Sequence, residues 1–116
     1  MREYLALLLA EARHEHFRAV FLDSGQRLLR EEEMWSGSVD EVPIYPRLVI
    51  GRAIELGASG LILVHNHPSG DPSPSRADGE MTKAVASAGR VLGVRVIDHL
   101  IVSRHAVFSM RDAGML

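Results

Sequence analysis

The chain has 116 residues, of which 47% are hydrophobic and 24% charged, and its formal net charge is −2. We therefore expect one globular domain over residues 1–116. Because no apolar run approaches the roughly 20 residues that span a bilayer, we expect a cytoplasmic protein with no membrane partner. The 13 basic residues are scattered, so charge gives DNA contact no support, and the lack of cysteine excludes disulfides and thiolate metal ligands.

Apolar periodicity and turn residues predict the elements of the first half of the chain. Leucines and alanines at helical spacing predict a short helix over residues 4–13, and a compact apolar run predicts a strand over 17–22. Residues 23–26 have the composition of a turn, so 27–30 are expected to pair back as the second arm of a hairpin. The acidic run at 31–33 is expected to be a solvated edge.

The second half of the chain predicts alternating helices and strands. Helices are expected over residues 45–56 and from Ser75 to about Leu92, where Gly93 ends the pattern. Further strands are expected at 60–64, at 94–97, and in a closing hairpin formed by 101–103 and 106–109. This order predicts an α/β fold with a mixed β-sheet flanked by helices.

A loop rich in proline, glycine and serine connects the strand at 60–64 to the helix that begins at Ser75. His65 and His67 lie two apart at the end of that strand, where extended backbone projects both side chains to the same side. The first turn of the helix holds Asp78, whose carboxylate can turn back toward both rings. Two imidazoles and one carboxylate form a three-ligand site with an open position, which is typical of catalytic zinc.

The same residues can also be explained by structural roles that need no metal. Ser75 followed three residues later by Asp78 is also a helix-capping pattern, and capping is compatible with a functional role. His99 follows Asp98 at a strand end, where a core or surface position is favoured over contact with a ligand. Three further histidines are interpreted as surface residues: His14, His16 and His105.

This segment resembles the JAMM motif of the JAB/MPN metallopeptidases, H-x-H-x7-S-x2-D, which His65, His67, Ser75 and Asp78 match at every spacing. At a finer level, residues 21–23, 36–38, 65–72 and 98–99 resemble the bacterial RadC family, which is associated with DNA repair. The resemblance covers residues from about 7 to 116. It implies a JAB/MPN fold, a three-layer sandwich related to that of cytidine deaminases.

The resemblance also implies a mechanism. One zinc ion per chain would be held by His65, His67 and Asp78, and the Ser75 hydroxyl would donate a hydrogen bond to the developing oxyanion. A glutamate before the first strand activates the water in this family, and Glu15 has that place. The fallback bases are Glu11, Glu41 and Glu55. The implied reaction is hydrolysis of an amide or isopeptide bond in a peptide or protein substrate.

Longer RadC-like chains carry an N-terminal region with helix-hairpin-helix character, for which this chain has no room. Any DNA contact that the region supplies is therefore expected to be missing. The alternative function is that of a non-enzymatic accessory or adaptor protein in DNA repair or recombination. The oligomeric state is left open, with a homodimer as one option.

Overall fold

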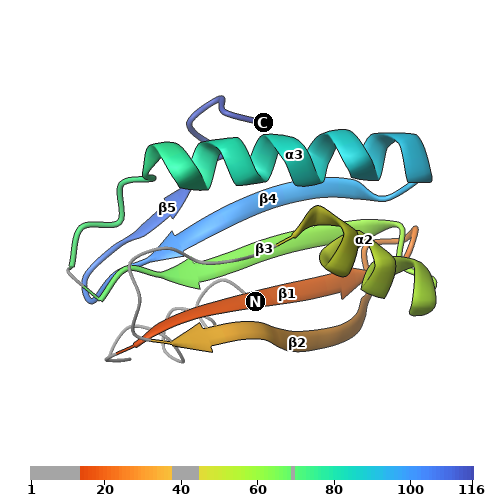
Figure 1. Cartoon of the computed structure of the whole chain (residues 1–116), viewed down its shortest axis with the longest axis horizontal. Helices are drawn as coiled ribbons and strands as arrows, with labels where there is room; N and C mark the ends of the chain where they lie inside the picture. The colour runs from red at the N-terminus through yellow and green to blue at the C-terminus, as the bar shows by residue number, and fades with distance from the viewer. Residues whose placement is uncertain (1–13, 38–44, 69) are drawn as a thin grey trace.

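The computed structural model describes residues 14–37, 45–68 and 70–116. The elements are β1 (Glu15–Leu22), β2 (Leu28–Gly37), α2 (Pro46–Glu55), β3 (Gly60–Asn66), α3 (Arg76–Leu92), β4 (Arg95–Val102) and β5 (Val107–Ser109). The strands of this part of the chain form one sheet in the order β2-β1-β3-β4-β5 (Figure 1). All neighbours pair antiparallel except β3 and β4, which are parallel and are joined by α3. The predicted α/β fold with a mixed sheet is confirmed.

The acidic run predicted as a solvated edge lies in the middle of β2, which is the edge strand of the sheet and continues to Gly37. Glu33 is exposed as predicted, whereas Glu31 and Glu32 are half-buried. Strand pairing continues because arginines neutralise these carboxylates on both faces of the sheet. Arg18 Nε donates to Glu31 Oε1 at 2.7 Å, and Arg52 of α2 donates to both oxygens of Glu32 at 2.8 Å. Interactions with distant arginines therefore decide the length of this strand.

Two other strands are longer than predicted, because polar residues interrupt their apolar sequence patterns. β3 extends past the predicted residues 60–64 to Asn66, and the strands predicted at 94–97 and 101–103 are one strand, β4. The buried carboxylate of Asp98 allows this continuity, because it accepts hydrogen bonds from Ser109 Oγ at 2.6 Å and from the backbone N–H of Arg111 at 3.0 Å. A buried polar residue with such partners does not interrupt a strand.

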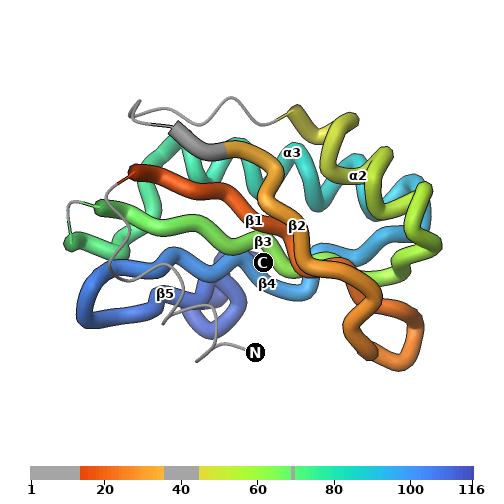
Figure 2. Tube along the Cα trace, turned by 90° about the horizontal axis from the view of Figure 1, so that it is seen from below, coloured from red at the N-terminus to blue at the C-terminus, as the bar shows by residue number. Residues whose placement is uncertain are grey.

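Both described helices lie on one face of the sheet (Figures 1 and 2). Their shared core contains buried side chains from the sheet and from both helices, among them Phe17, Phe21, Ile50, Leu63 and Val85. A second buried cluster on the opposite face includes Val20, Val64 and Val102. The helix predicted over residues 4–13 lies outside the described residues.

The inward face of α3 is a single stripe formed by Asp78, Thr82, Val85 and Gly89, all of which are buried. Gly89 allows close packing, because a Cβ atom there would lie 2.2 Å from the carbonyl oxygen of Val94. Asp78 is therefore directed toward the sheet by the same periodicity that buries the apolar residues of the helix.

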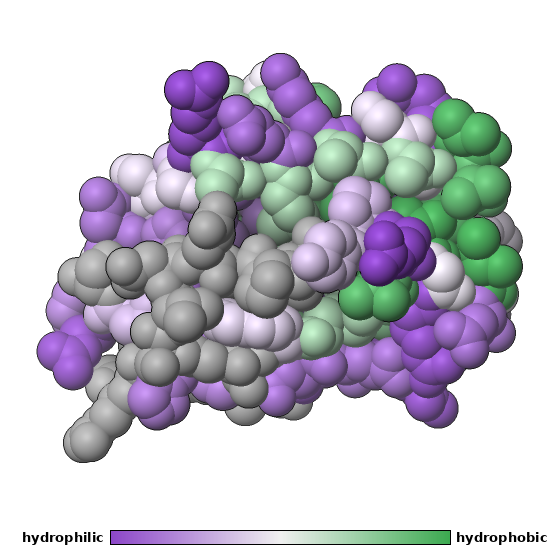
Figure 3. All heavy atoms as spheres, viewed as in Figure 1, coloured by the Kyte–Doolittle hydropathy of each residue, from purple (hydrophilic) through white to green (hydrophobic). Residues whose placement is uncertain are grey.

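Exposed apolar side chains of α2 and α3 include Leu48, Ile54, Val91 and Leu92. Figure 3 shows hydrophobic surface gathered at the end of the molecule where α3 finishes. None of the helices described is long and apolar enough to cross a membrane.

Candidate metal centre

The end of β3 places one histidine in the core and one just beyond the strand. His65 is fully buried, and its ring stacks on Phe17, its cross-strand neighbour on β1, with 5.7 Å between centroids. His67 follows the last residue of β3, and its backbone N–H donates to the carbonyl of Val102 on β4 at 2.9 Å. The sheet therefore holds the backbone of both residues.

The N-terminus of α3 fixes the third side chain of the centre through a capping box. The backbone N–H of Asp78 donates to Ser75 Oγ at 3.0 Å, and the backbone N–H of Ser75 donates to Asp78 Oδ2 at 2.8 Å. The capping pattern is thus present, and it is compatible with a functional role. Since Ser75 Oγ accepts this bond, its hydroxyl hydrogen remains available to another acceptor.

The structure brings His65, His67 and Asp78 together. The Nε2 atoms of the two histidines lie 3.0 Å apart. Asp78 places Oδ1 3.2 Å from His65 Nε2 and Oδ2 3.1 Å from His67 Nε2. The ligand atoms of a tetrahedral zinc ion, each about 2.0–2.2 Å from the metal, lie about 3.3–3.6 Å apart. A zinc ion therefore fits after a small outward movement of the three side chains.

A buried hydrogen-bond relay assigns the tautomer of His65. Thr82 Oγ1 donates to the carbonyl of Asp78 at 2.7 Å and accepts from His99 Nδ1 at 2.6 Å. With its proton on Nδ1, neutral His99 has an acceptor at Nε2, to which His65 Nδ1 donates at 2.7 Å. The proton of His65 is thereby assigned to Nδ1, and its Nε2 lone pair faces His67 and Asp78.

His67 has the same tautomer for a different reason. Its Nδ1 atom donates to the backbone carbonyl of Asp71 at 2.9 Å, which leaves Nε2 as the acceptor. Metal-binding histidines usually donate their other ring N–H to such a partner. Two nitrogen lone pairs and a carboxylate thus converge, and they repel one another unless a cation or a proton lies among them.

The electrostatics of the centre show what the converging groups require. Burial alone would raise the pKa of Asp78, but interactions with His65 and His67 lower it, so the carboxylate is ionised. A hydrogen bond from either Nε2 needs a proton on that atom, and a bound cation would take the place of this proton. The hydrogen bond with Asp78 raises the pKa of His67. Burial lowers the pKa of His99 well below its ordinary value, so this ring is neutral, as the relay requires. The ionised carboxylate of Asp78 favours a positive charge among the three groups, either a proton or a cation.

Glu15 lies beside the centre at the start of β1. One of its carboxylate oxygens and one ring nitrogen each of His65 and His67 lie within 4.8 Å of one another. Geometry therefore offers two carboxylates for the histidine pair, and the oxygens of Asp78 lie 3.1–3.2 Å from the two Nε2 atoms. A carboxylate beside the histidine pair is also placed to act as a base on a water molecule next to an ion.

The residue between the two histidines holds the backbone around Glu15. The Asn66 side chain accepts from the backbone N–H of His16 at 2.6 Å and donates to the carbonyl of His14 at 2.9 Å. The two bonded backbone groups belong to the residues on either side of Glu15, so the Asn66 side chain connects the start of β1 to the end of β3. Asn66 therefore sets the position of Glu15 relative to the histidines.

Nearly the whole chain is similar to proteins of one family. A family described as RadC-like JAB domain matches residues 1–115. The chain belongs to this family. UPF0758 proteins of Rhodobacter capsulatus and Ruegeria pomeroyi are each 47% identical to this RadC-like JAB domain over 98% of its length. A UPF0758 protein of Methylibium petroleiphilum is 45% identical over the whole chain. The matches cover 53%, 51% and 52% of these relatives, so the chain spans about half their length.

The remaining candidates of the RadC-like domain lie away from the centre or outside the described residues. Glu55 is 69% exposed and lies 3.7 Å from Arg52, while Glu11 and Glu41 fall among the residues that the structure does not describe. His14 and His105 are exposed, as predicted. His16 is partly exposed and pairs with Glu33 of the edge strand β2, so it lies at the surface and not in the core.

Sequence reasoning missed two residues of the RadC-like centre, Thr82 and Asn66, which were not considered. His99 lies in the core, as one favoured interpretation had it, and it is also the hydrogen-bond partner of His65, which was the less favoured alternative. Two signals could have indicated this group: the polar pair Asp98-His99 inside an otherwise apolar strand, and an amide between two candidate ligands.

Proposed function

We propose that this chain is a zinc-dependent hydrolase of the JAMM type, which cleaves an amide or isopeptide bond in a peptide or protein. Its zinc ligands would be His65, His67 and Asp78, with one ion per chain. The observation that carries the proposal is the convergence of two Nε2 lone pairs and one carboxylate within 3.0–3.2 Å. Membership of a JAB family, in which domains can be hydrolytic, supports it.

Zinc, when bound, supplies Lewis acidity to a substrate carbonyl and lowers the pKa of a coordinated water to about 7. Glu15 accepts a proton as the water oxygen attacks the carbonyl carbon, and returns it to the leaving nitrogen as the C–N bond breaks. The Ser75 hydroxyl donates a hydrogen bond to the carbonyl oxygen as it becomes negative. Asn66 holds Glu15 in place for both proton transfers.

A metal measurement tests the ligands. The protein is first stripped of metal with a chelator and then dialysed against zinc. Elemental mass spectrometry should then find one zinc ion per chain. His67→Ala should lose the ion, and His105→Ala, which removes an exposed histidine, should keep it. Wild-type protein that is folded but takes up no divalent metal would contradict the proposal.

Replacement of the base tests the reaction separately from the metal. Glu15→Gln should retain zinc and lose hydrolysis of internally quenched peptides and of isopeptide-linked conjugates, while Glu55→Gln should behave as wild type. Equal hydrolysis by Glu15→Gln and wild type would remove Glu15 from the mechanism. Nothing in the geometry of the described residues favours the adaptor alternative.

A further inference from the structure

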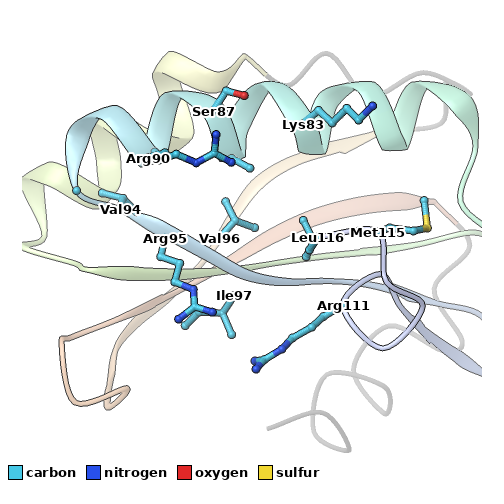
Figure 4. Close-up of a pocket in the computed structure, with 13 residues that line it drawn as sticks. Lys83, Ser87, Arg90, Val94, Arg95, Val96, Ile97, Arg111, Met115 and Leu116 are labelled. Atoms are coloured by element: carbon cyan, nitrogen blue, oxygen red, sulfur yellow. The ribbon is translucent and has the colours of Figure 1, made fainter.

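A groove of about 680 Å³ lies between α3, the start of β4 and the residues after β5, apart from the metal centre (Figure 4). It follows the second half of α3 from Lys83 to Gly93, whereas the candidate metal ligand on this helix, Asp78, lies in its first turn. The groove therefore makes no use of the three candidate ligands, and its function does not depend on the proposed hydrolysis.

The groove has cationic side chains on both of its sides. Figure 4 shows Lys83 and Arg90 on α3, and Arg95 and Arg111 on the opposite side. None of the residues that line the groove is acidic. Within the described part of the chain, none of these four cations forms an ion pair with a side-chain carboxylate. Because the whole chain has a net charge of −2, this positive potential is a local feature.

Apolar side chains lie between these cations. Val94 is buried, and Val96 and Ile97 are half-buried. Met115 and Leu116 are 44% and 45% exposed, so their apolar surface is open to a ligand. An occupant must therefore present apolar groups as well as negative charge.

The edge of β4 supplies a third feature. β4 pairs with β5 only over Leu100–Val102. Among the described residues, the preceding segment, Arg95–Asp98, has a neighbouring strand only on the β3 side. Its other edge lies beside the groove, where Arg95, Val96 and Ile97 are lining residues. An open strand edge of this kind can accept an extended peptide through main-chain hydrogen bonds.

We propose that this groove binds an acidic, extended segment of a partner protein, which adds as a strand to the open edge of β4. Side chains alternate along a strand, so one face of the segment would place apolar residues against Val96, Met115 and Leu116. Carboxylates on its other face would reach Arg95, whereas Lys83 and Arg90 of α3 would add attraction over a longer distance. The groove has no aromatic lining residue on which a nucleobase could stack, and its apolar surface does not suit a phosphate backbone.

Fluorescence anisotropy with a labelled synthetic peptide of alternating glutamate and valine tests the proposal. The zinc-loaded chain should bind this peptide, and higher ionic strength should weaken the binding. Charge reversal in the double variant Arg90→Glu, Arg95→Glu should reduce affinity on the order of tenfold or more. The matched control Arg47→Glu, at an exposed position of α2, should bind as wild type.

Two further measurements distinguish strand addition from other occupants. Hydrogen exchange should show new protection of amides within Arg95–Asp98 when the peptide binds. Labelled single-stranded and duplex DNA, measured alongside, should bind more weakly than the peptide. Equal peptide affinity of the double variant and wild type, no protection of the β4 edge, or tighter binding of DNA would each overturn the proposal. Circular dichroism of every variant verifies the fold.

Discussion

His65 and His99 are joined by a buried hydrogen bond of 2.7 Å between Nδ1 of the first ring and Nε2 of the second. The direction of this bond is set by Thr82, whose hydroxyl hydrogen goes to the carbonyl of Asp78. Thr82, one helical turn after Asp78, thus decides which nitrogen of His65 faces the candidate metal site. The two rings belong to the parallel neighbours β3 and β4, so this relation is a consequence of the crossover through α3.

Removal of the relay should weaken metal binding. His99→Phe removes the acceptor of His65, and Thr82→Val removes the hydroxyl that sets the tautomer of His99. Loss of such a partner typically reduces metal affinity by about 10–100-fold. Zinc affinity should be measured by competition with a chromophoric chelator, with His105→Ala as the control. Unchanged affinity in both variants would show that His65 needs no fixed tautomer.

Asn66→Ala should separate catalysis from metal binding. The variant loses both hydrogen bonds that hold the backbone on either side of Glu15, so we expect the carboxylate to be displaced. Displacement of a catalytic group by about 1 Å can cost on the order of 10²-fold in rate. Zinc content should remain that of wild type, and kcat should fall more than KM rises. Loss of zinc together with activity would instead assign Asn66 to the shape of the metal centre.

Ser75→Ala should affect stability and rate through two different atoms. Loss of the Oγ acceptor at the start of α3 should lower the free energy of unfolding by about 1 kcal/mol, measured in urea. Loss of the hydroxyl donor should lower kcat by about 10²–10³-fold. Ser87→Ala, at an exposed site on the same helix, is the matched control. A normal rate with reduced stability would restrict Ser75 to helix capping.

The ion pair between Arg52 and Glu32 should make stability depend on acid pH. The side-chain hydrogen bonds from Arg52 lower the pKa of Glu32 from 4.5 to about 2. Between these values the unfolded chain takes up a proton on Glu32 and the folded chain does not, so the free energy of unfolding falls as the pH falls. Urea titrations of metal-free protein should show this loss in wild type and less of it in Glu32→Gln.

Glu80→Gln is the control for that experiment, because Glu80 is 68% exposed and pairs with Arg76 of the same helix. A pH profile of Glu32→Gln that coincides with wild type would show that the pair with Arg52 is not retained in solution. Exposed ion pairs contribute little to stability. The half-buried, bidentate pair between β2 and α2 is therefore the place where the effect should be found.

The sequence by itself determined the features that depend on local periodicity and residue chemistry. It indicated the α/β order, the hairpin of β1 and β2, the helix after Ser75 and the resemblance to the RadC family. These features could be predicted because side-chain direction repeats every two residues in a strand and every 3.6 residues in a helix. The spacing of a motif can likewise be read directly along the chain. The choice of His65, His67 and Asp78 as candidate ligands rested on the same local information.

Only the tertiary structure decided the roles that depend on partners distant in the chain. Asp98 and His99 looked like the end of a strand, since the sequence does not show that Ser109, Thr82 and His65 satisfy them. Glu31 and Glu32 looked solvated for the same reason, because Arg18 and Arg52 come from other elements. Whether a polar side chain can be buried depends on the hydrogen-bond partners that the fold places around it. Those partners are assembled by the pairing of β3 with β4 and the packing of α2 and α3 on the sheet.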